Sequence, residues 1–204
     1  DDDDLRRGMP TNHIKFGEAT AILAGDGLLT RAFEIIAREI QPAEVAAACC
    51  VELASAAGAE GMVGGQQADL EAETTPVRTV EALEAIHRRK TGRLLSAALL
   101  MGGHIARTSP QNLRSLQIYG ETIGLAFQIA DDLLDVVGDA GKMGKGVRKD
   151  SDLNKLTYPS LLGLEESRRR AELLVQRACD AVSHLGPQSE PLQTLARYII
   201  ERDH

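Results

Sequence analysis

Three aspartates in the second half of the chain have the spacing of a small carboxylate cluster. Asp131, Asp132 and Asp135 lie in the segment "IADDLLDVV", and positions four apart on a helix share one face. Like charges at that spacing repel one another unless a cation lies between them. Mg²⁺ prefers oxygen ligands and binds through one or two carboxylates together with substrate phosphates. The residues therefore indicate a magnesium–phosphate site, and a solvated acidic helix end is the alternative with the same spacing.

A glycine- and lysine-rich segment follows the aspartates. Its glycines are Gly138, Gly141, Gly144 and Gly146, and its basic residues are Lys142, Lys145, Arg148, Lys149 and Lys155. The glycines predict a flexible loop rather than more helix, and a loop of this kind can close over a ligand. A flexible surface turn has the same composition, and the segment lacks the Walker pattern of nucleotide-binding loops. The loop is a candidate phosphate site only in combination with the aspartates.

Acidic and basic residues meet again at the start of the sequence, in "DDDDLRRG". Arg6 and Arg7 could each hold phosphate oxygens through paired hydrogen bonds. A frayed acidic terminus or the remnant of a cleavage tag would contain the same residues. Because the sequence starts with Asp1 rather than Met, we expect it to be the C-terminal part of a longer protein.

Two further segments contain polar residues that indicate no particular chemistry when each segment is taken alone. "HRRKTG" contains Lys90 and Thr91, and "GGQQADLEAE" contains Gln66 and Asp69. The histidines at 87, 104 and 184 have no metal-ligand spacing. We expect these three histidines to be surface residues or hydrogen-bonded helix residues.

Composition and charge narrow the class of protein. The 204 residues are 43% hydrophobic and 26% charged, which is typical of one globular domain, here 1–204, rather than of disorder. The net charge of -7 argues against a nucleic-acid partner, whose binding surfaces are basic. We find no apolar run that approaches the roughly 18 residues of a membrane span and no signal peptide. Cys49, Cys50 and Cys179 are expected to be reduced thiols in the cytoplasm.

Helical periodicity dominates the elements that must position these residues. Helices are predicted over 16–39, 43–63, 79–106, 109–137, 160–186 and 191–202. Thr79 and Ser109 are the expected N-caps, with Pro110 in the first turn. The first helix has a broad apolar face that consists of Ile22, Leu23, Leu28, Leu29, Phe33 and Ile36. No strand of convincing length is visible, so the prediction is an all-α bundle of at least six helices.

Taken together and in order, these segments resemble the trans-polyprenyl diphosphate synthases, most closely the bacterial-type farnesyl diphosphate synthases. The matching segments are "DDDDLRRGMPTNHIKFGEATAILAGD", "GMVGGQQADLEAE", "IHRRKTG", "GLAFQIADDLLDVVGD", "LGLEESRRRAE" and "ARYIIERDH". They cover most of the chain, and several ordered motifs rarely arise by chance. The resemblance implies the isoprenoid synthase fold, a helical bundle around a central cavity, with its N-terminal helices outside this sequence.

The resemblance also implies roles for single residues. Arg6 would bind the allylic diphosphate and Arg7 the isopentenyl diphosphate. Lys90 would bind the allylic diphosphate as well, with Thr91 and Gln128 near the developing carbocation.

The remaining implied residues belong to two aspartate motifs and a mobile loop. The second aspartate motif is intact as Asp131, Asp132 and Asp135. Asp1 would be the last aspartate of the first motif, whose other members would precede this sequence. Lys145 would be a second diphosphate lysine on the loop, and Asp150 and Lys155 match further loop positions. The family's additional lysine and arginine for isopentenyl diphosphate have no counterpart in this sequence.

The implied reaction is ionisation, condensation and elimination. Several Mg²⁺ ions, with Mn²⁺ as an alternative, and basic residues would stabilise the leaving diphosphate of a dimethylallyl or geranyl primer. The double bond of isopentenyl diphosphate would then attack the allylic cation to give farnesyl diphosphate after proton loss. An aliphatic, closed site would keep water from quenching that cation. The resemblance also implies a cytoplasmic homodimer.

Four alternatives remain at this point. Geranylgeranyl diphosphate is the other product considered, because product length depends on residues before Asp1. A catalytically silent subunit of a heteromeric synthase would be expected to lack aspartates of one motif. A class I terpene cyclase would usually carry a mixed Asn/Ser/Glu metal motif in place of the second aspartate motif, which is intact in this sequence. A purely structural helical protein would leave the ordered motifs unexplained.

Overall fold

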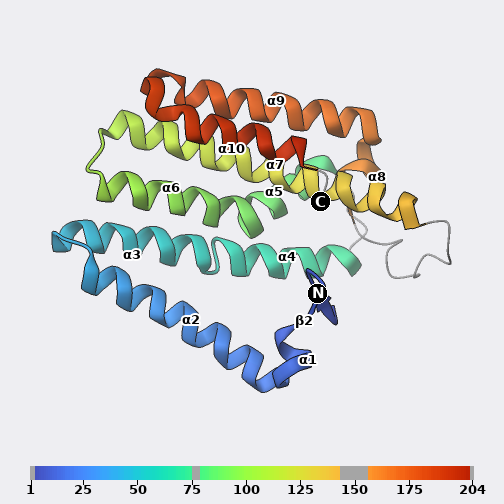
Figure 1. The fold of residues 1–204 in the computed structure, drawn as a ribbon, viewed down its shortest axis with the longest axis horizontal. Helices are drawn as coiled ribbons and strands as arrows, with labels where there is room; N and C mark the ends of the chain where they lie inside the picture. Colours follow the sequence, from blue (N-terminus) through green and yellow to red (C-terminus); the bar gives the residue numbers. More distant parts are fainter. Residues whose placement is uncertain (1–2, 75–78, 143–155, 203–204) are drawn as a thin grey trace. The chain divides into compact units, whose positions relative to one another are not determined.

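The computed structural model describes residues 3–74, 79–142 and 156–202. It is almost entirely helical, which confirms the predicted all-α class (Figure 1). Two compact units, 1–50 and 51–204, are distinguished within the chain and are described here one at a time. The prediction of a single domain over 1–204 stays a prediction.

The first unit begins with a short hairpin that the sequence did not lead us to expect. Strand β1 (Leu5–Arg6) pairs antiparallel with β2 (Met9–Pro10), with Arg6 opposite Met9. The two residues of the turn between them, Arg7 and Gly8, have φ values of 51° and 74°. Positive φ at both central residues is typical of the two-residue turns that suit the twist of a hairpin. Arg7 is therefore held in a backbone conformation that a non-glycine residue adopts only at some energetic cost.

Helices α1 (Asn12–Phe16), α2 (Glu18–Glu39) and the start of α3 (Ala43–Ala57) complete this unit. Gly17, with φ of 86°, separates the first two, so the predicted helix over 16–39 begins two residues late. The apolar face of α2 follows the predicted pattern, but most of it is not buried. Ile22, Leu23 and Leu28 are 66%, 68% and 73% exposed, and only Ile36 is buried. Periodicity identifies an apolar stripe on a helix but not what covers that stripe.

The second unit contains the remaining helices. They are α4 (Met62–Thr74), α5 (Val80–His87), the π-helical turn η1 (Arg88–Gly92), α6 (Arg93–Ile105), α7 (Pro110–Lys142), α8 (Tyr158–Leu162), α9 (Leu164–Val182), the 3₁₀ segment η3 (Ser183–Ser189) and α10 (Glu190–Glu201). Both predicted caps are confirmed. Thr79 Oγ1 accepts from the Ala82 N–H at 3.2 Å, and Ser109 Oγ accepts from the Asn112 N–H at 3.2 Å.

Several predicted boundaries need correction. The helix expected over 43–63 is broken between Ala57 and Met62, and the one expected over 160–186 is broken at Gly163, where φ is 80°. Gly138 and Gly141 lie inside α7, which continues to Lys142, so the predicted loop does not start there. Helix propensity falls by only about 1 kcal/mol per glycine, which a long, well-packed helix tolerates. Residues 143–155 of that loop lie outside the described residues.

The stretch Ala43–Thr74 is apolar enough and long enough to cross a membrane, with a mean hydropathy of 1.3 in its most apolar window. Core helices of soluble proteins pass the same test, so this is weak evidence for a span. The break between α3 and α4 interrupts the stretch, and gives the expectation of no membrane span weak support.

Helix α7 is the centre of the second unit and contributes to both of its apolar clusters. One cluster joins α7 to α9 and α10 and consists of Tyr119, Ile123, Ala126, Ala130, Val175, Ala178, Cys179, Val182, Ala196 and Ile199. The other joins α7 to α5, α8 and α9 and consists of Leu83, Leu125, Ile129, Tyr158 and Ala171. Figure 1 shows α6, α7, α9 and α10 running alongside one another. The core is mostly aliphatic, with Tyr119 and Tyr158 as its buried aromatic residues, and all three cysteines are reduced thiols.

Tyr119 gives a test of this core at alkaline pH. Its hydroxyl donates to the Leu192 carbonyl at 2.6 Å, and burial, with a smaller contribution from Cys179, raises its pKa from 10.0 to about 12. The neutral phenol therefore stabilises the fold fully below the unfolded pKa, and this contribution is lost as pH rises through about 12. In urea unfolding, Tyr119→Phe should lose stability less steeply than wild type above pH 10. Tyr198→Phe, at a 56% exposed position, should retain the wild-type slope, and equal slopes in all three proteins would contradict the prediction.

Candidate active site

The turn that carries Lys90 and Thr91 is fixed by two close helix contacts. A Cβ on Gly65 of α4 would lie 2.6 Å from the Lys90 Cα, and a Cβ on Gly124 of α7 would lie 2.6 Å from the Gly92 Cα. Neither distance leaves room for a side chain, so the two glycines allow α4 and α7 to pack directly on η1. π-Helical turns are rare and occur often at functional sites. The sequence predicted one continuous helix over 79–106, and the π-turn within it was missed.

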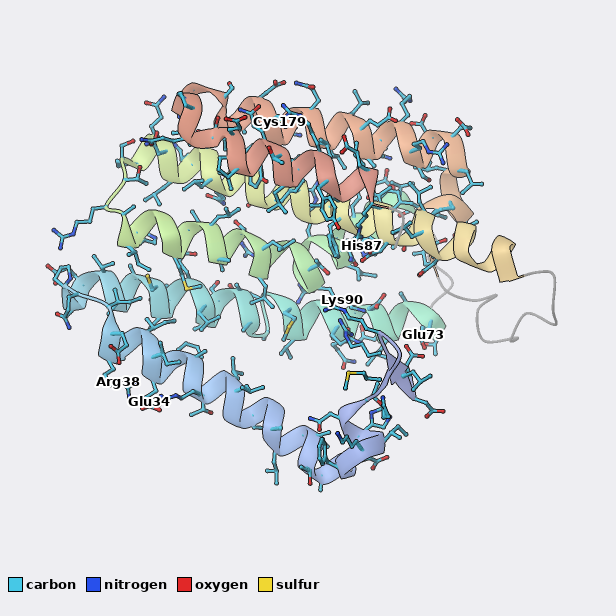
Figure 2. The ribbon with its side chains drawn as sticks, viewed as in Figure 1. Glu34, Arg38, Glu73, His87, Lys90 and Cys179 are labelled. Carbon is cyan, nitrogen blue, oxygen red and sulfur yellow. The ribbon has the colours of Figure 1, made fainter. Side chains whose placement is uncertain are left out.

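Polar contacts hold the same turn to α4. Lys90 Nζ donates to Asp69 Oδ2 at 2.6 Å, and both side chains are only 28% exposed. Arg89 donates to the Ala59 carbonyl at 2.8 Å. Lys90 lies three positions after His87 in the sequence, and both side chains are labelled in Figure 2. Its ammonium group is thus positioned by Asp69, one of the residues that the sequence offered without a defined role.

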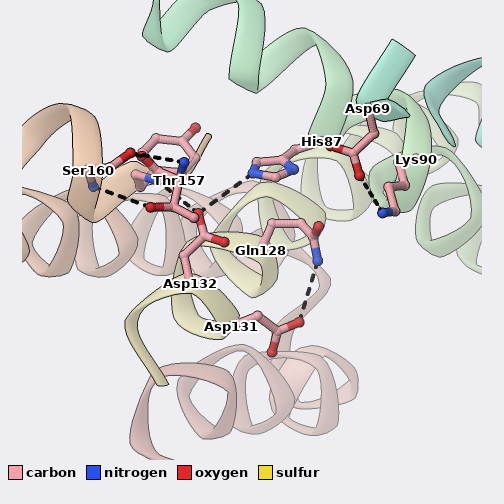
Figure 3. Close-up of polar contacts among 9 residues, drawn as sticks. Asp69, His87, Lys90, Gln128, Asp131, Asp132, Thr157 and Ser160 are labelled. Carbon is pink, nitrogen blue, oxygen red and sulfur yellow. Dashed lines mark hydrogen bonds and ion pairs between the residues drawn. The ribbon is translucent and has the colours of Figure 1, made fainter. Parts of the chain in front are cut away.

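The polar residues of α7 continue from the glycine contact. Gly124, Gln128, Asp131 and Asp135 follow one another at three- and four-residue spacing and so share one face of the helix. Gln128 Nε2 donates to Asp131 Oδ2 at 3.5 Å (Figure 3), and Asp135 is exposed. Helix α7 therefore presents an amide and two carboxylates along the face on which η1 packs.

Asp131 carries an unfavourable negative charge in this setting. Burial raises the pKa of its carboxyl group above the ordinary value, and the charges of Asp135 and Asp132 also raise it. Arg202, which follows α10, acts in the opposite direction through an ion pair with Asp131 Oδ1. The Arg202 guanidinium also lies over the Phe127 ring, 4.3 Å from its centroid. Arg202 was not among the predicted site residues, because nothing in the sequence links it to Asp131, 71 positions earlier.

The donor set fits a magnesium ion that also binds phosphate. Among the residues that the structure describes, no group of three histidine, cysteine or carboxylate side chains is placed to hold a metal alone. Mg²⁺ needs only one or two protein carboxylates when waters and phosphates complete its shell. Asp131 and Asp135 supply two on one face of α7, and a divalent cation would relieve their mutual repulsion.

Asp132 faces a different environment from its two neighbours in the motif. It is only 6% exposed, and its Oδ2 accepts from the Tyr158 backbone N–H at 2.9 Å. His87 Nε2 lies 3.9 Å from the same oxygen. The structure therefore does not bring the three predicted metal ligands onto one surface, and their assignment as ligands stays a prediction.

Two of the three histidines have the predicted hydrogen-bonding contacts, and His87 does not. His104 Nε2 lies 3.4 Å from Glu52 Oε1, and His184 Nε2 lies 3.2 Å from Asn112 Oδ1, so both are hydrogen-bonded as predicted. His87 is 7% exposed, and neither of its ring nitrogens has a hydrogen-bond partner among the residues that the structure describes. The prediction of a surface or hydrogen-bonded side chain is wrong for His87, because the helix it belongs to packs against α7 and α8 at that point.

The other predicted site residues lie in the first unit, in η1 or outside the described residues. Arg6 ends β1 and Arg7 occupies the hairpin turn of the first unit, where both are exposed. Thr91 is half-buried in η1. Asp1, Lys145, Asp150 and Lys155 lie outside the described residues. The roles assigned to these residues stay predictions.

Arg202 gives a test of the electrostatics around Asp131. Arg202→Gln removes the ion pair that lowers the pKa of Asp131, so the metal-free protein should unfold at a lower temperature. The freed carboxylate should then bind magnesium at lower concentration, and the stabilisation by added Mg²⁺ should reach half its maximum earlier. Thermal unfolding over a magnesium titration measures both effects. Arg197→Gln, at an exposed position of α10, is the control, and a wild-type magnesium midpoint in Arg202→Gln would contradict the prediction.

Comparison with known proteins identifies relatives along the whole chain. The polyprenyl synthetase family model matches residues 1–185. The chain is 46% identical over 207 residues to farnesyl diphosphate synthase of Bacillus subtilis and 50% identical over 211 residues to that of Escherichia coli. It is 43% identical over 206 residues to a geranylgeranyl diphosphate synthase of Cyanophora paradoxa. These alignments cover 100% of this chain and 70%, 70% and 69% of the three relatives.

Solved structures give the same result for the fold. An apo FPP/GFPP synthase from Zymomonas mobilis matches with a TM-score of 0.85 and 40% identity, over 97% of this chain and 66% of that one. A geranyltransferase from Helicobacter pylori, complexed with magnesium and isoprenyl diphosphate, matches with a TM-score of 0.79 and 33% identity, over 97% and 65%. The chain thus spans about two thirds of these solved proteins. The predicted isoprenoid synthase fold and the predicted class of short-chain prenyl diphosphate synthases are confirmed by these relatives, and the chain belongs to the polyprenyl synthetase family.

Proposed function

We propose that the full-length protein condenses isopentenyl diphosphate with dimethylallyl or geranyl diphosphate to give farnesyl diphosphate. The observation that supports this most directly is the meeting of α4, η1 and α7. Gly65 of α4 and Gly124 of α7 both pack on η1, the turn that carries Lys90, and Gln128, Asp131 and Asp135 follow Gly124 along the same face of α7. Cations and carboxylates placed together in this way suit a metal-bound diphosphate rather than a nucleic acid or a peptide.

Magnesium enters the proposal through the donor set and through the Helicobacter pylori relative, whose structure contains magnesium and isoprenyl diphosphate. Asp131 and Asp135 would hold the ion from this chain, and Asp1 would contribute from the first aspartate motif. Bound there, magnesium would neutralise the negative charge that develops on the leaving diphosphate. More than one ion and replacement by Mn²⁺ are part of the proposal.

The chain's own residues act on the substrate in defined ways. Lys90 would exchange its contact with Asp69 for the allylic diphosphate, and the bonding electrons of the allylic C–O bond would leave with that group. The amide oxygen of Gln128 and the hydroxyl of Thr91 would place negative dipole ends near the allylic cation. The isopentenyl double bond forms the new C–C bond, and the released diphosphate takes the proton.

Basic residues outside this group would complete the diphosphate sites. Arg6 is proposed for the allylic diphosphate and Arg7 for isopentenyl diphosphate. Lys145 and Lys155 are proposed as further diphosphate ligands. The strong negative charge of both substrates supports a larger set of cations than Lys90 alone provides.

The decisive experiment uses the full-length protein with labelled isopentenyl diphosphate, Mg²⁺ and each allylic primer in turn. Chromatography of the products should show farnesyl diphosphate from both dimethylallyl and geranyl diphosphate. Predominant geranylgeranyl diphosphate would replace the proposed product by the alternative one. The absence of product with every primer would contradict the proposed prenyl transfer activity and favour a catalytically silent subunit.

The proposed enzyme is a cytoplasmic homodimer. The exposed side chains of Ile22, Leu23 and Leu28 on α2 support an association surface, because soluble monomers rarely expose large contiguous apolar patches. Light scattering coupled to gel filtration of the full-length protein should give twice the monomer mass. A monomer mass at micromolar concentration would contradict the dimer.

A further inference from the structure

The carboxylate of Asp132 is directed away from the proposed metal ligands. Successive residues of an α-helix are separated by roughly 100° around its axis, so adjacent Asp131 and Asp132 cannot face the same way. Asp132 lies at the border between the polar face of α7 and the apolar cluster formed by Leu125, Ile129 and Tyr158. With 6% exposure, it needs hydrogen-bond partners inside the protein.

The first turn of α8 explains what this carboxylate does. The Thr157 N–H donates to Ser160 Oγ at 3.1 Å, and the Ser160 N–H donates to Thr157 Oγ1 at 3.3 Å. Pro159 has no N–H. The Tyr158 N–H is the one backbone donor of this turn that the capping residues leave over, and Asp132 accepts it at 2.9 Å. A buried N–H without an acceptor would destabilise the fold by about 1–3 kcal/mol.

His87 extends the contact to the segment that carries Lys90. Its Nε2 is 3.9 Å from Asp132 Oδ2, and its ring stacks on that of Tyr158 with centroids 5.8 Å apart and an angle of 21°. His87 ends α5, and η1 with Lys90 follows directly. Figure 3 shows Asp132 reaching toward His87 and α8 while Asp131 points to Gln128. One carboxylate therefore joins α7 to α8 and lies beside the end of α5.

We propose that Asp132 is a positioning residue rather than a metal ligand. By holding Tyr158 and lying beside His87, it fixes the rotation of α7 relative to α5 and α8, and so the direction in which Asp131 is presented. The aspartate motif is thereby divided into a metal-binding pair, Asp131 and Asp135, and a structural member. This inference rests on the proposed function, because it concerns the geometry of that metal site.

Three variants separate the roles. Asp132→Asn keeps an oxygen that can accept the Tyr158 N–H, and its amide could donate to His87, but it removes the charge that a magnesium ligand needs. Asp132→Ala removes the acceptor, and Asp131→Asn removes a proposed ligand. The readout is the Mg²⁺ concentration that gives half of the maximal thermal stabilisation of the full-length protein.

The positioning role predicts a wild-type midpoint for Asp132→Asn and a midpoint raised by about 10-fold for Asp132→Ala, as for other residues that orient a metal ligand. Asp131→Asn should lose the magnesium response. Loss of the magnesium response in Asp132→Asn, as in Asp131→Asn, would overturn the inference. Lower stability of Asp132→Ala with an unchanged magnesium midpoint would also overturn it. A wild-type protein without any magnesium response would instead overturn the proposed function, and the inference with it.

A second measurement needs no variant of Asp132. Hydrogen exchange of the Tyr158 amide, followed by NMR, reports directly on its hydrogen bond. If Asp132 keeps this bond, protection of the amide should be unchanged or greater when Mg²⁺ is added. If Asp132 moved to bind the metal, protection would fall, and the inference would be wrong.

Discussion

Asp131→Asn is expected to reduce prenyl transfer by on the order of 10²-fold or more, as loss of a key electrostatic group does in other enzymes, without loss of the fold. Burial is the largest cause of the raised pKa of Asp131, so the charged form is disfavoured in the folded protein. Asparagine keeps the size of the side chain and removes that charge. The metal-free variant should therefore be at least as stable as the wild type at neutral pH, although it loses the ion pair with Arg202.

The sign of this effect can be tested through pH. A carboxyl group with a raised folded-state pKa contributes stability below its unfolded pKa, and this contribution is lost as pH rises through the folded value. Denaturant unfolding of the metal-free protein at several pH values above 4 should show this loss in the wild type and a reduced loss in Asp131→Asn. Asp26→Asn, at an exposed position of α2, is the control for both activity and stability. Near-normal turnover of geranyl diphosphate by Asp131→Asn would contradict the metal role.

Gly65→Ala is expected to have the second largest effect, acting through the position of Lys90. The added Cβ would lie 2.6 Å from the Lys90 Cα, and its neighbours are backbone atoms that cannot rotate away. Overpacking of this kind typically destabilises a protein by about 1–3 kcal/mol. Because η1 must move away from α4, the Lys90–Asp69 ion pair should be disturbed and the affinity for the allylic diphosphate should fall. Denaturant unfolding and steady-state kinetics with varied allylic substrate measure the two effects.

Gly102→Ala provides the matched control for this variant. Gly102 lies in α6, and a Cβ there would have nothing within 4 Å. Alanine in an unobstructed helix interior should stabilise the protein by about 0.5–1 kcal/mol and leave the kinetics unchanged. Wild-type stability and kinetics in Gly65→Ala would show that η1 does not depend on close packing by α4.

Much of this protein could be predicted from the sequence, because the relevant signals are local. Helical periodicity gave the all-α class, and the caps at Thr79 and Ser109 were correct because a cap depends on residues within one turn. The spacing of Asp131 and Asp135 placed both carboxylates on one face, since helix geometry alone decides this. The ordered motifs led to the family, which the relatives confirm.

Other features depended on contacts between residues far apart in the sequence. The tertiary structure decided that Asp132 turns toward Tyr158 and His87, that Arg202 pairs with Asp131, and that Gly65 packs on the Lys90 turn. It also showed that the apolar stripe of α2 is largely exposed. Periodicity fixes the direction of a side chain relative to its own helix, whereas its partner and its burial are set by how separate helices pack. For that reason the sequence could predict which residues form the candidate site, but not how those residues divide its roles.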